Sequence, residues 1–145
     1  MRAHALALVA CLGTLSSADT LAAWDFNTDD GSTGTGTLAA SQGAGTLSTV
    51  GGATTFFGGS FGSSDPADFP LDSAWSVGGY PDQGTASGTV GWSAMVSTLG
   101  YQSIQVSFDL RNQPSSNKWF RLDTTTDGGG SWVQGQTYGI ADADV

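Results

Sequence analysis

The sequence contains no glutamate, one cysteine and one histidine. The cysteine and the histidine, Cys11 and His4, both lie at the N-terminus, so a chain without its N-terminal segment has neither. Such a chain cannot form a disulfide, a Ser–His or Cys–His nucleophile pair, or a thiol-based active site. A pair of aspartates could still hydrolyse a glycosidic bond, but no spacing among the 13 Asp residues singles out a pair. We therefore predict a protein without catalytic residues.

The N-terminus has the order of a secretory signal peptide. A basic residue, Arg2, precedes the apolar stretch 5–12, and small residues follow. Ser16 and Ala18 fit the small −3 and −1 positions of a cleavage site, which predicts cleavage after Ala18, with Ala23 as the second choice. The apolar stretch is far shorter than the roughly 18 residues that a membrane span requires. The sequence therefore predicts an exported protein with no transmembrane span after cleavage.

Attachment to the cell envelope is a second interpretation of the same segment. Residues 8–11 (LVAC) resemble a lipobox, in which Cys11 would carry a lipid and become the mature N-terminus. Both interpretations place the protein outside the cytoplasm, either extracellular or in the cell envelope. The simpler one divides the chain into a signal peptide at 1–18 and a single domain at 19–145.

Basic residues are also scarce. The predicted mature chain has three, Arg111, Lys118 and Arg121, against 13 Asp, which gives a net charge of −10. Such an acidic chain is poorly suited to binding nucleic-acid phosphates or an anionic membrane surface. Acidity of this degree mostly serves solubility, although clusters of Asp can also hold Ca²⁺. We predict no nucleic-acid partner.

Helix signals are nearly absent after residue 20, because no stretch keeps an apolar period of 3.6 residues. Short alternating or apolar runs between Gly, Ser and Thr predict strands instead, at 21–26, 46–50, 53–57, 74–77 and 85–96. Gly51 and Gly52 predict a hairpin turn that joins the strands at 46–50 and 53–57.

The clearest alternation lies at 101–111, followed by a turn and a partner strand at 118–124. The apolar side chains of the two strands share one face and are Ile104, Val106, Phe108, Leu110, Phe120 and Leu122. The outer face of the partner strand holds Trp119, Arg121 and Asp123. This pattern predicts an antiparallel hairpin with one face on a core and the other in solvent.

Several short strands with glycine-rich turns and no helix predict an all-β fold, an antiparallel β-sandwich of jelly-roll type. The sequence ends at 138–145 (YGIADADV), where a further strand is expected. One interpretation is a truncated product that lacks one or two closing strands, which would leave an open sheet edge.

Residues 125–132 (TTDGGGSW) form the most specific local motif. They resemble the Asp-box, a hairpin found in sialidases and many secreted β proteins, through Thr125, Asp127, Gly129, Ser131 and Trp132. Asp127 can accept hydrogen bonds from the turn backbone, Gly129 can take a positive φ, and Trp132 can pack under the turn. We predict a structural role, because sialidase chemistry needs an arginine cluster and a Tyr/Glu nucleophile pair that this chain lacks.

Residues 25–31 (DFNTDDG) resemble the start of a Ca²⁺ loop, with oxygen ligands at Asp25, Asn27 and Asp29. The match fails in detail, because the glycine comes one position late and position 12 is Gly36 instead of a bidentate Glu. A solvated turn is the simpler interpretation, with Ca²⁺ as the alternative and no other cofactor indicated.

The outer face of the late hairpin is the best candidate for ligand binding. Trp119 would form an aromatic platform flanked by Asp109, Arg111, Arg121 and Asp123. An aromatic ring suits the apolar C–H face of a sugar and the polar groups suit its hydroxyls, which predicts a polysaccharide ligand. In the alternative interpretation a loop or second sheet covers Trp119, and the charged residues pair across strands.

Four stretches of the domain resemble bacterial exported β-sandwich proteins, many of which carry a C-terminal PEP-CTERM sorting signal. The matching stretches are 21–27 (LAAWDFN), 79–84 (GYPDQG), 96–111 (from VSTLGYQ to VSFDLR) and 122–132 (LDTTTDGGGSW). The chain departs from the family because the sorting tail contains Pro-Glu-Pro and this sequence has no Glu. The resemblance implies an envelope or extracellular-matrix protein and carries over no catalytic residues. It also implies a kinship with modules found beside secreted nucleases and other extracellular enzymes.

Three functional hypotheses follow. The leading one is a non-catalytic secreted or cell-surface β-sandwich that binds polysaccharide. The second is an accessory N-terminal domain of a larger secreted hydrolase, a nuclease or glycosidase, with its chemistry encoded beyond residue 145. The third is a Ca²⁺-dependent structural or adhesive module.

Overall fold

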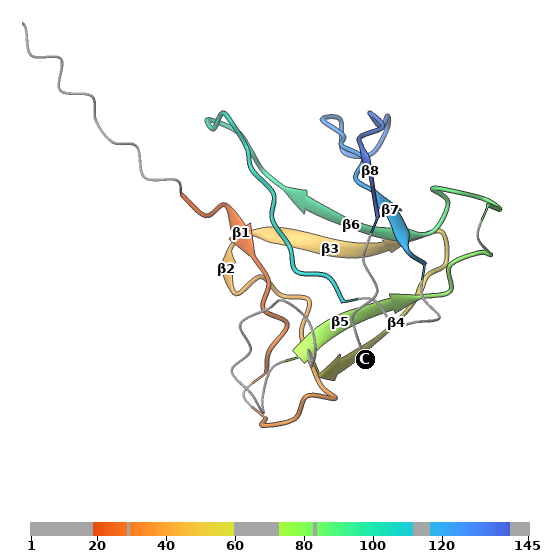
Figure 1. Cartoon of the computed structure of the whole chain (residues 1–145). Helices are drawn as coiled ribbons and strands as arrows, with labels where there is room; N and C mark the ends of the chain where they lie inside the picture. Colours follow the sequence, from red (N-terminus) through yellow and green to blue (C-terminus); the bar gives the residue numbers. More distant parts are fainter. Residues whose placement is uncertain (1–18, 29, 60–72, 83, 112–116, 140–145) are drawn as a thin grey trace, which may run out of the picture.

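The computed structural model describes residues 19–28, 30–59, 73–82, 84–111 and 117–139, and this part of the chain is all-β with no helix. The strands are β1 (Ala22–Ala23), β2 (Gln42–Gly43), β3 (Gly45–Val50), β4 (Thr54–Gly59), β5 (Ser73–Gly78), β6 (Gly91–Val96), β7 (Trp119–Arg121) and β8 (Thr137–Gly139). They form four antiparallel pairs: β1–β2, β3–β6, β4–β5 and β7–β8 (Figure 1).

The predicted all-β, antiparallel fold is confirmed at this level. The sheets are small and do not close into a complete sandwich or barrel within the described residues. The described part of the chain also contains no helix long and apolar enough to cross a membrane. The predicted signal peptide at 1–18, with its cleavage site and Cys11, lies outside the described residues.

β3 and β4 lie where strands were predicted, but they do not pair with each other. Gly51 and Gly52 form the predicted turn, with φ of 67° and 77° and a hydrogen bond from Ala53 N–H to Val50 O of 3.4 Å. All six residues of β3 nevertheless pair with β6, and all six of β4 pair with β5. The hairpin prediction was wrong, because turn residues and alternation locate strands without specifying which edges meet.

Two other predicted strands are shorter than expected. Of the predicted strand 21–26 only β1 remains, and of the predicted strand 85–96 only β6. Residues 84–90 form turns instead, with Gly84 and Gly88 at φ of 82° and 77°. A non-glycine side chain rarely adopts such φ values, so these glycines end the strand rather than interrupt it.

Segment 101–111, predicted as the clearest strand, is not a strand in the structure, and β7 pairs with β8 instead. The alternation still indicates the inward direction of Phe108, whose ring centroid lies 5.9 Å from that of Trp92 and 5.7 Å from that of Phe120. Ile104 and Val106 belong to the same predicted face but are exposed. Alternation predicted the face on which Phe108 and Phe120 lie, whereas the pairing of β7 depended on a three-residue strand too short to give a signal.

Six aromatic rings connect three of the four strand pairs, β4–β5, β3–β6 and β7–β8. Successive members lie 5.2–6.4 Å apart between ring centroids, and we call them the aromatic row: Phe26, Trp75, Trp92, Phe108, Phe120 and Tyr138. Trp75 on β5 meets Trp92 on β6, so the row joins the β4–β5 pair to the β3–β6 pair. Edge-to-face contacts of this kind stabilise by about 0.5–1.5 kcal/mol each beyond area burial.

The described residues are joined by the aromatic row and not by a buried hydrophobic core. Among the described residues no hydrophobic side chain is fully buried, and Trp92 and Phe108 in the row are each 37% exposed. The most buried residue is polar: Ser73, at the start of β5, is 1% exposed. The cohesion of the described part therefore depends on ring contacts and on specific hydrogen bonds.

Candidate functional site

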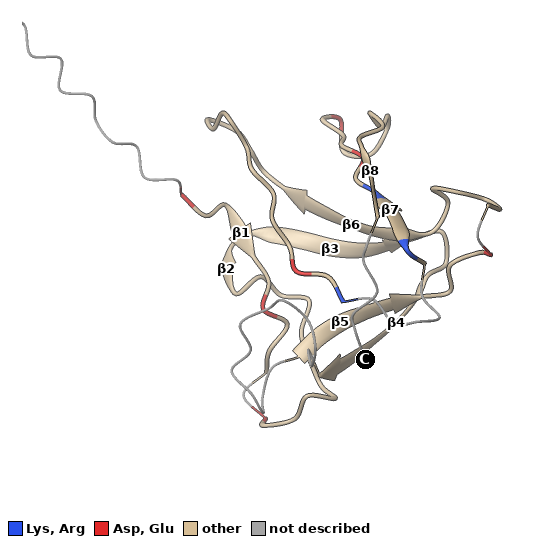
Figure 2. Ribbon diagram, in the orientation of Figure 1, with Lys and Arg blue, Asp and Glu red and all other residues tan. Residues whose placement is uncertain are grey.

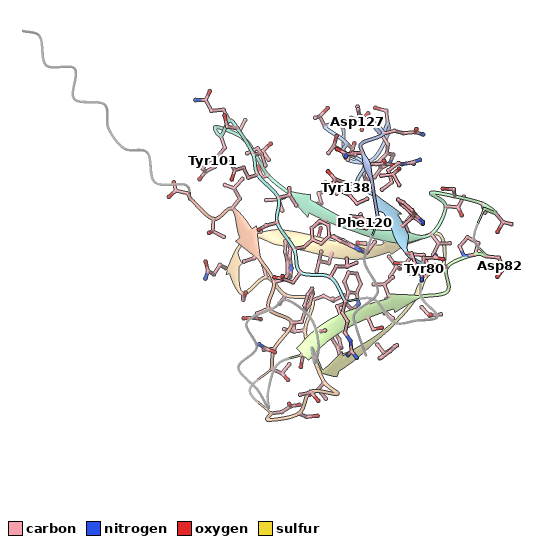
Figure 3. The ribbon with its side chains drawn as sticks, viewed as in Figure 1. Tyr80, Asp82, Tyr101, Phe120, Asp127 and Tyr138 are labelled. Carbon is pink, nitrogen blue, oxygen red and sulfur yellow. The ribbon has the colours of Figure 1, made fainter. Side chains whose placement is uncertain are left out.

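The β7–β8 pair presents two chemically different faces. Phe120 pairs with Tyr138, and their rings stack at 5.2 Å and 18°, so this face belongs to the aromatic row (Figure 3). The flanking pairs, Trp119 with Gly139 and Arg121 with Thr137, point the other way because side chains alternate along a strand. We call this second side, with Asp123, the Trp119 face.

Trp119 rests on a glycine. Three atoms of its six-membered ring lie 3.1, 3.3 and 3.4 Å from the position that a Cβ would take at Gly139. These nearly equal distances place the face of the ring, and not its edge, over the glycine. The indole therefore lies against the β8 backbone on one side, and 60% of the residue remains exposed. This geometry leaves the opposite ring face toward solvent, whereas one interpretation of the sequence was that a loop or sheet would cover it.

Arg121 and Asp123 form a fixed ion pair beside this ring. Arg121 Nε donates to Asp123 Oδ1 and Nη2 donates to Oδ2, both at 2.7 Å. Gly135 N–H also donates to Asp123 Oδ1 at 3.2 Å. Hydrogen bonding to Arg121 holds the pKa of Asp123 below its usual range and raises the pKa of the guanidinium. The ion pair joins Arg121, the last residue of β7, to Asp123, two residues further along the chain, and does not cross between strands as the alternative interpretation proposed.

A glycine also makes room for this ion pair. A Cβ at Gly88 would lie 2.8 Å from Arg121 Nη2, so the guanidinium lies against the turn at 84–90. The side chains of Arg121 and Asp123 are 28% and 22% exposed. The turn at 84–90 and the N–H of Gly135 therefore hold the pair in place, and part of each side chain remains exposed to solvent.

The other two residues of the predicted platform lie elsewhere. Asp109 and Arg111 belong to segment 101–111, which contacts β7 through Phe108 and Phe120, on the side opposite Trp119. The sequence placed them with Trp119 because it predicted that segment as the partner of β7. Thr137 and Gly139 of β8 occupy the neighbouring positions instead. Figure 2 shows the basic residues on or next to β7 and at the end of segment 101–111, with acidic residues spread over the loops.

The loop 125–131 is organised around the Asp127 carboxylate (Figure 3). Asp127 Oδ1 accepts from Thr125 Oγ1 at 2.7 Å and from Ser131 N–H at 2.9 Å, while Oδ2 accepts from Ser131 Oγ at 2.6 Å. Gly129 has φ of 96°. A Cβ added at Gly129 would lie 3.7 Å from the ring of Trp132. The bonds from Ser131 and Thr125 hold the pKa of Asp127 far below its usual range.

A second loop repeats this arrangement and was missed from the sequence. Asp30 Oδ1 accepts from Thr28 Oγ1 at 3.0 Å, from Ser32 N–H at 2.9 Å and from Thr35 Oγ1 at 2.8 Å. The bond from Thr35, followed by those from Ser32 and Thr28, lowers the pKa of Asp30. Thr-x-Asp-Gly occurs at 28–31 and at 125–128, with the glycine at φ of 74° and 71° respectively. That repeated tetrapeptide was the signal available in the sequence.

The structure does not show the three predicted Ca²⁺ ligands, Asp25, Asn27 and Asp29, grouped around one point. Asp29 lies outside the described residues. Asp25 Oδ1 accepts from Asn27 N–H at 3.1 Å, and Asn27 Oδ1 accepts from Ser73 N–H at 2.7 Å. Among the described residues no group of three or more His, Cys, Asp or Glu is placed to hold a metal ion.

Comparison with protein-family models, with curated protein sequences and with solved structures found no match to this chain.

Proposed function

We propose that this chain is a non-catalytic extracellular module that binds polysaccharide on the Trp119 face. The observation that carries the proposal is the position of the Trp119 ring, which lies flat on Gly139 and is 60% exposed. A sugar ring has an apolar C–H face that packs on an aromatic face, and a rim of hydroxyls that needs donors and acceptors. The neighbouring Arg121, Asp123 and Thr137 supply both.

The Trp119 face is suited to binding because its parts are held in place before a ligand arrives. Arg121 and Asp123 fix each other through two hydrogen bonds, and Gly135 N–H fixes Asp123 from the next segment. A side chain that is already ordered loses little conformational entropy on binding. The same face offers no nucleophile–base pair, so binding and not hydrolysis is the function proposed.

We further propose that the strand pairs are parts of an antiparallel β-sandwich of jelly-roll type in an exported protein of the PEP-CTERM-associated kind. The contact of Trp75 with Trp92, with centroids 6.4 Å apart, supports facing layers formed by the β4–β5 and β3–β6 pairs. The signal-peptide pattern at 1–18 supports export to the cell surface or the extracellular space.

Binding to a panel of soluble neutral polysaccharides, measured by affinity electrophoresis and calorimetry, tests the proposed function. Trp119→Ala should weaken binding at least about tenfold, since truncation of a central aromatic anchor commonly costs 2 kcal/mol or more. Phe56→Ala is the matched control, because Phe56 is 66% exposed but lies on β4, outside the Trp119 face. Equal losses in both variants, or no binding by the unmodified chain, would overturn the proposal.

Gly139→Val provides a second test that leaves Trp119 in the chain. Its Cβ would lie 3.1 Å from the indole, closer than ordinary contact, and its methyl groups would add to the crowding and should shift the ring away from β8. The variant should bind polysaccharide more weakly while keeping the circular dichroism spectrum of a β protein. Unchanged affinity would show that the position of the ring on Gly139 has no part in binding.

A further inference from the structure

The charges on the Trp119 face are balanced internally. Arg121 is the only basic residue on this face among the described residues, and two of its N–H groups are directed at the two oxygens of Asp123. Lys118 immediately precedes β7, in a bend, and is not part of the cross-strand pairs that define this face. The face therefore carries no uncompensated positive charge that could recognise a carboxylate or sulfate on a sugar.

The rest of the chain opposes binding of an anionic polymer. The predicted mature chain has a net charge of −10, and those of its aspartates that the structure describes lie outside the strands (Figure 2). Charges within about 10 Å of each other interact appreciably at 0.1 M salt, so a polyanion lying across the domain would be repelled. The same field attracts polycations, but it does so from any direction and without using Trp119.

The polar groups on the face suit hydroxyls. A guanidinium has five N–H donors, and Arg121 directs two of them at Asp123. Thr137, the cross-strand partner of Arg121, is exposed and adds a hydroxyl. Neutral donors and acceptors around an aromatic ring complement an uncharged sugar without burying an unpaired charge.

From these observations we infer that the ligand of the Trp119 face is an uncharged polysaccharide, and that the face discriminates against uronate-containing and sulfated polymers. The inference rests on the proposed function and specifies its ligand class. The discrimination depends on the Arg121–Asp123 pair, because Asp123 neutralises the one cation on the face.

The test compares a neutral polymer with its own charged derivatives. The purified chain is titrated with soluble hydroxyethyl cellulose and galactomannan, and then with the carboxymethylated form of whichever polymer binds, in 20 mM and 500 mM NaCl. The neutral polymer should bind with a dissociation constant that changes less than twofold with salt. The carboxymethylated polymer should bind at least tenfold more weakly in 20 mM NaCl, with the difference shrinking in 500 mM NaCl.

Asp123→Asn tests whether the charge of Asp123, and not only its structural role, sets the preference for uncharged polymers. Removing the carboxylate leaves Arg121 uncompensated, so this variant should gain at least threefold in affinity for the carboxymethylated polymer in 20 mM NaCl. Asp82→Asn is the matched control, because it removes one carboxylate at an exposed position outside the Trp119 face. A thermal melt of each variant verifies that it is folded.

The outcomes separate the inference from the proposed function. Equal or tighter binding of the carboxymethylated polymer, lost in Trp119→Ala, overturns the inference and leaves the proposed function standing. Absence of binding to every polymer overturns both. Binding that is equal in the parent chain and in Trp119→Ala does not use the Trp119 face, and it also counts against both.

Discussion

The Oδ1 atom of Asn27 accepts a hydrogen bond from the backbone N–H of Ser73 at 2.7 Å, across 46 residues of sequence. Ser73 also donates from its Oγ to the backbone oxygen of Thr35 at 2.9 Å. These two bonds attach the loop that follows β1 to the first residue of β5. Ser73 is the most buried of the described residues, so water cannot easily replace either bond.

Replacing Asn27 with alanine should destabilise the fold. The change leaves the N–H of Ser73 without its acceptor in a buried position, which costs about 1–3 kcal/mol of unfolding free energy. Urea denaturation followed by tryptophan fluorescence measures the loss. Ser48→Ala on β3 is the control, because Ser48 is an exposed residue of a different strand pair. A loss no larger than that of the control would show that the Asn27–Ser73 bond does not hold the loop.

Replacing Trp75 with alanine should break the aromatic row between Phe26 and Trp92. Trp75 contacts both Phe26 and Trp92, so the change removes two ring contacts and leaves a gap between two strand pairs. We expect a loss of about 2–4 kcal/mol, somewhat below the usual cost of removing a fully buried aromatic ring. Trp75→Phe should lose about half as much because it retains a ring, and near-ultraviolet circular dichroism should follow the same order. Equal losses for the two variants would show that ring contacts are not what joins the β4–β5 and β3–β6 pairs.

Two glycines allow backbone strain to be separated from crowding. Gly43 and Gly52 have positive φ, 66° and 77°, which an alanine tolerates poorly. A Cβ at Gly43 would collide with the backbone of Leu21, whereas a Cβ at Gly52 would meet nothing within 4 Å. Gly52→Ala should therefore cost only the conformational strain, about 1–2 kcal/mol. Gly43→Ala should cost at least about 1 kcal/mol more, in the range of overpacking. Thermal melts of the pair measure the difference, and equal midpoints would show that β1 is not packed closely on β2.

Much of the local structure could be predicted from the sequence, because it depends on residues that are close in the chain. The turn at Gly51 and Gly52, the positions of β3 and β5 and the inward direction of Phe108 all follow from alternation and turn chemistry. The all-β class follows from the absence of any helical period. These features need no information about distant partners.

The pairing of strands could not be predicted in the same way. Segment 101–111 has the strongest alternation in the chain, yet β7 pairs with β8, whose three residues include a glycine and give no period. For this reason the predicted platform contains Trp119, Arg121 and Asp123, which the structure brings together because they lie on β7 and directly after it. It included Asp109 and Arg111 on the assumption of a pairing that does not form, and omitted Thr137 and Gly139, which the pairing with β8 supplies.

Stability should depend on pH through the two Thr-x-Asp-Gly loops. The pKa values of Asp127 and Asp30 are lowered in the folded chain, chiefly by the hydroxyls of Ser131 and Thr35 respectively. An unfolded aspartate has a pKa of about 3.9. Between that value and the lower folded value, the unfolded chain binds protons that the folded chain does not, so unfolding becomes more favourable as the pH falls. The stability from these loops is fully present above about pH 5 and declines progressively below it.

Thermal melts between pH 7 and pH 2.5 measure this dependence. Asp127→Asn should melt at a lower temperature than the parent chain at pH 7, because the amide cannot accept from Thr125, Ser131 N–H and Ser131 Oγ together. The difference between the two should shrink as the pH falls, since the parent loses the same ionised acceptor. Asp82→Asn is the control, because Asp82 is an exposed aspartate outside both loops (Figure 3). The melting temperature of this variant should change with pH as that of the parent chain does. A constant gap between Asp127→Asn and the parent over the whole pH range would show that the ionised carboxylate is not what organises the loop at 125–131.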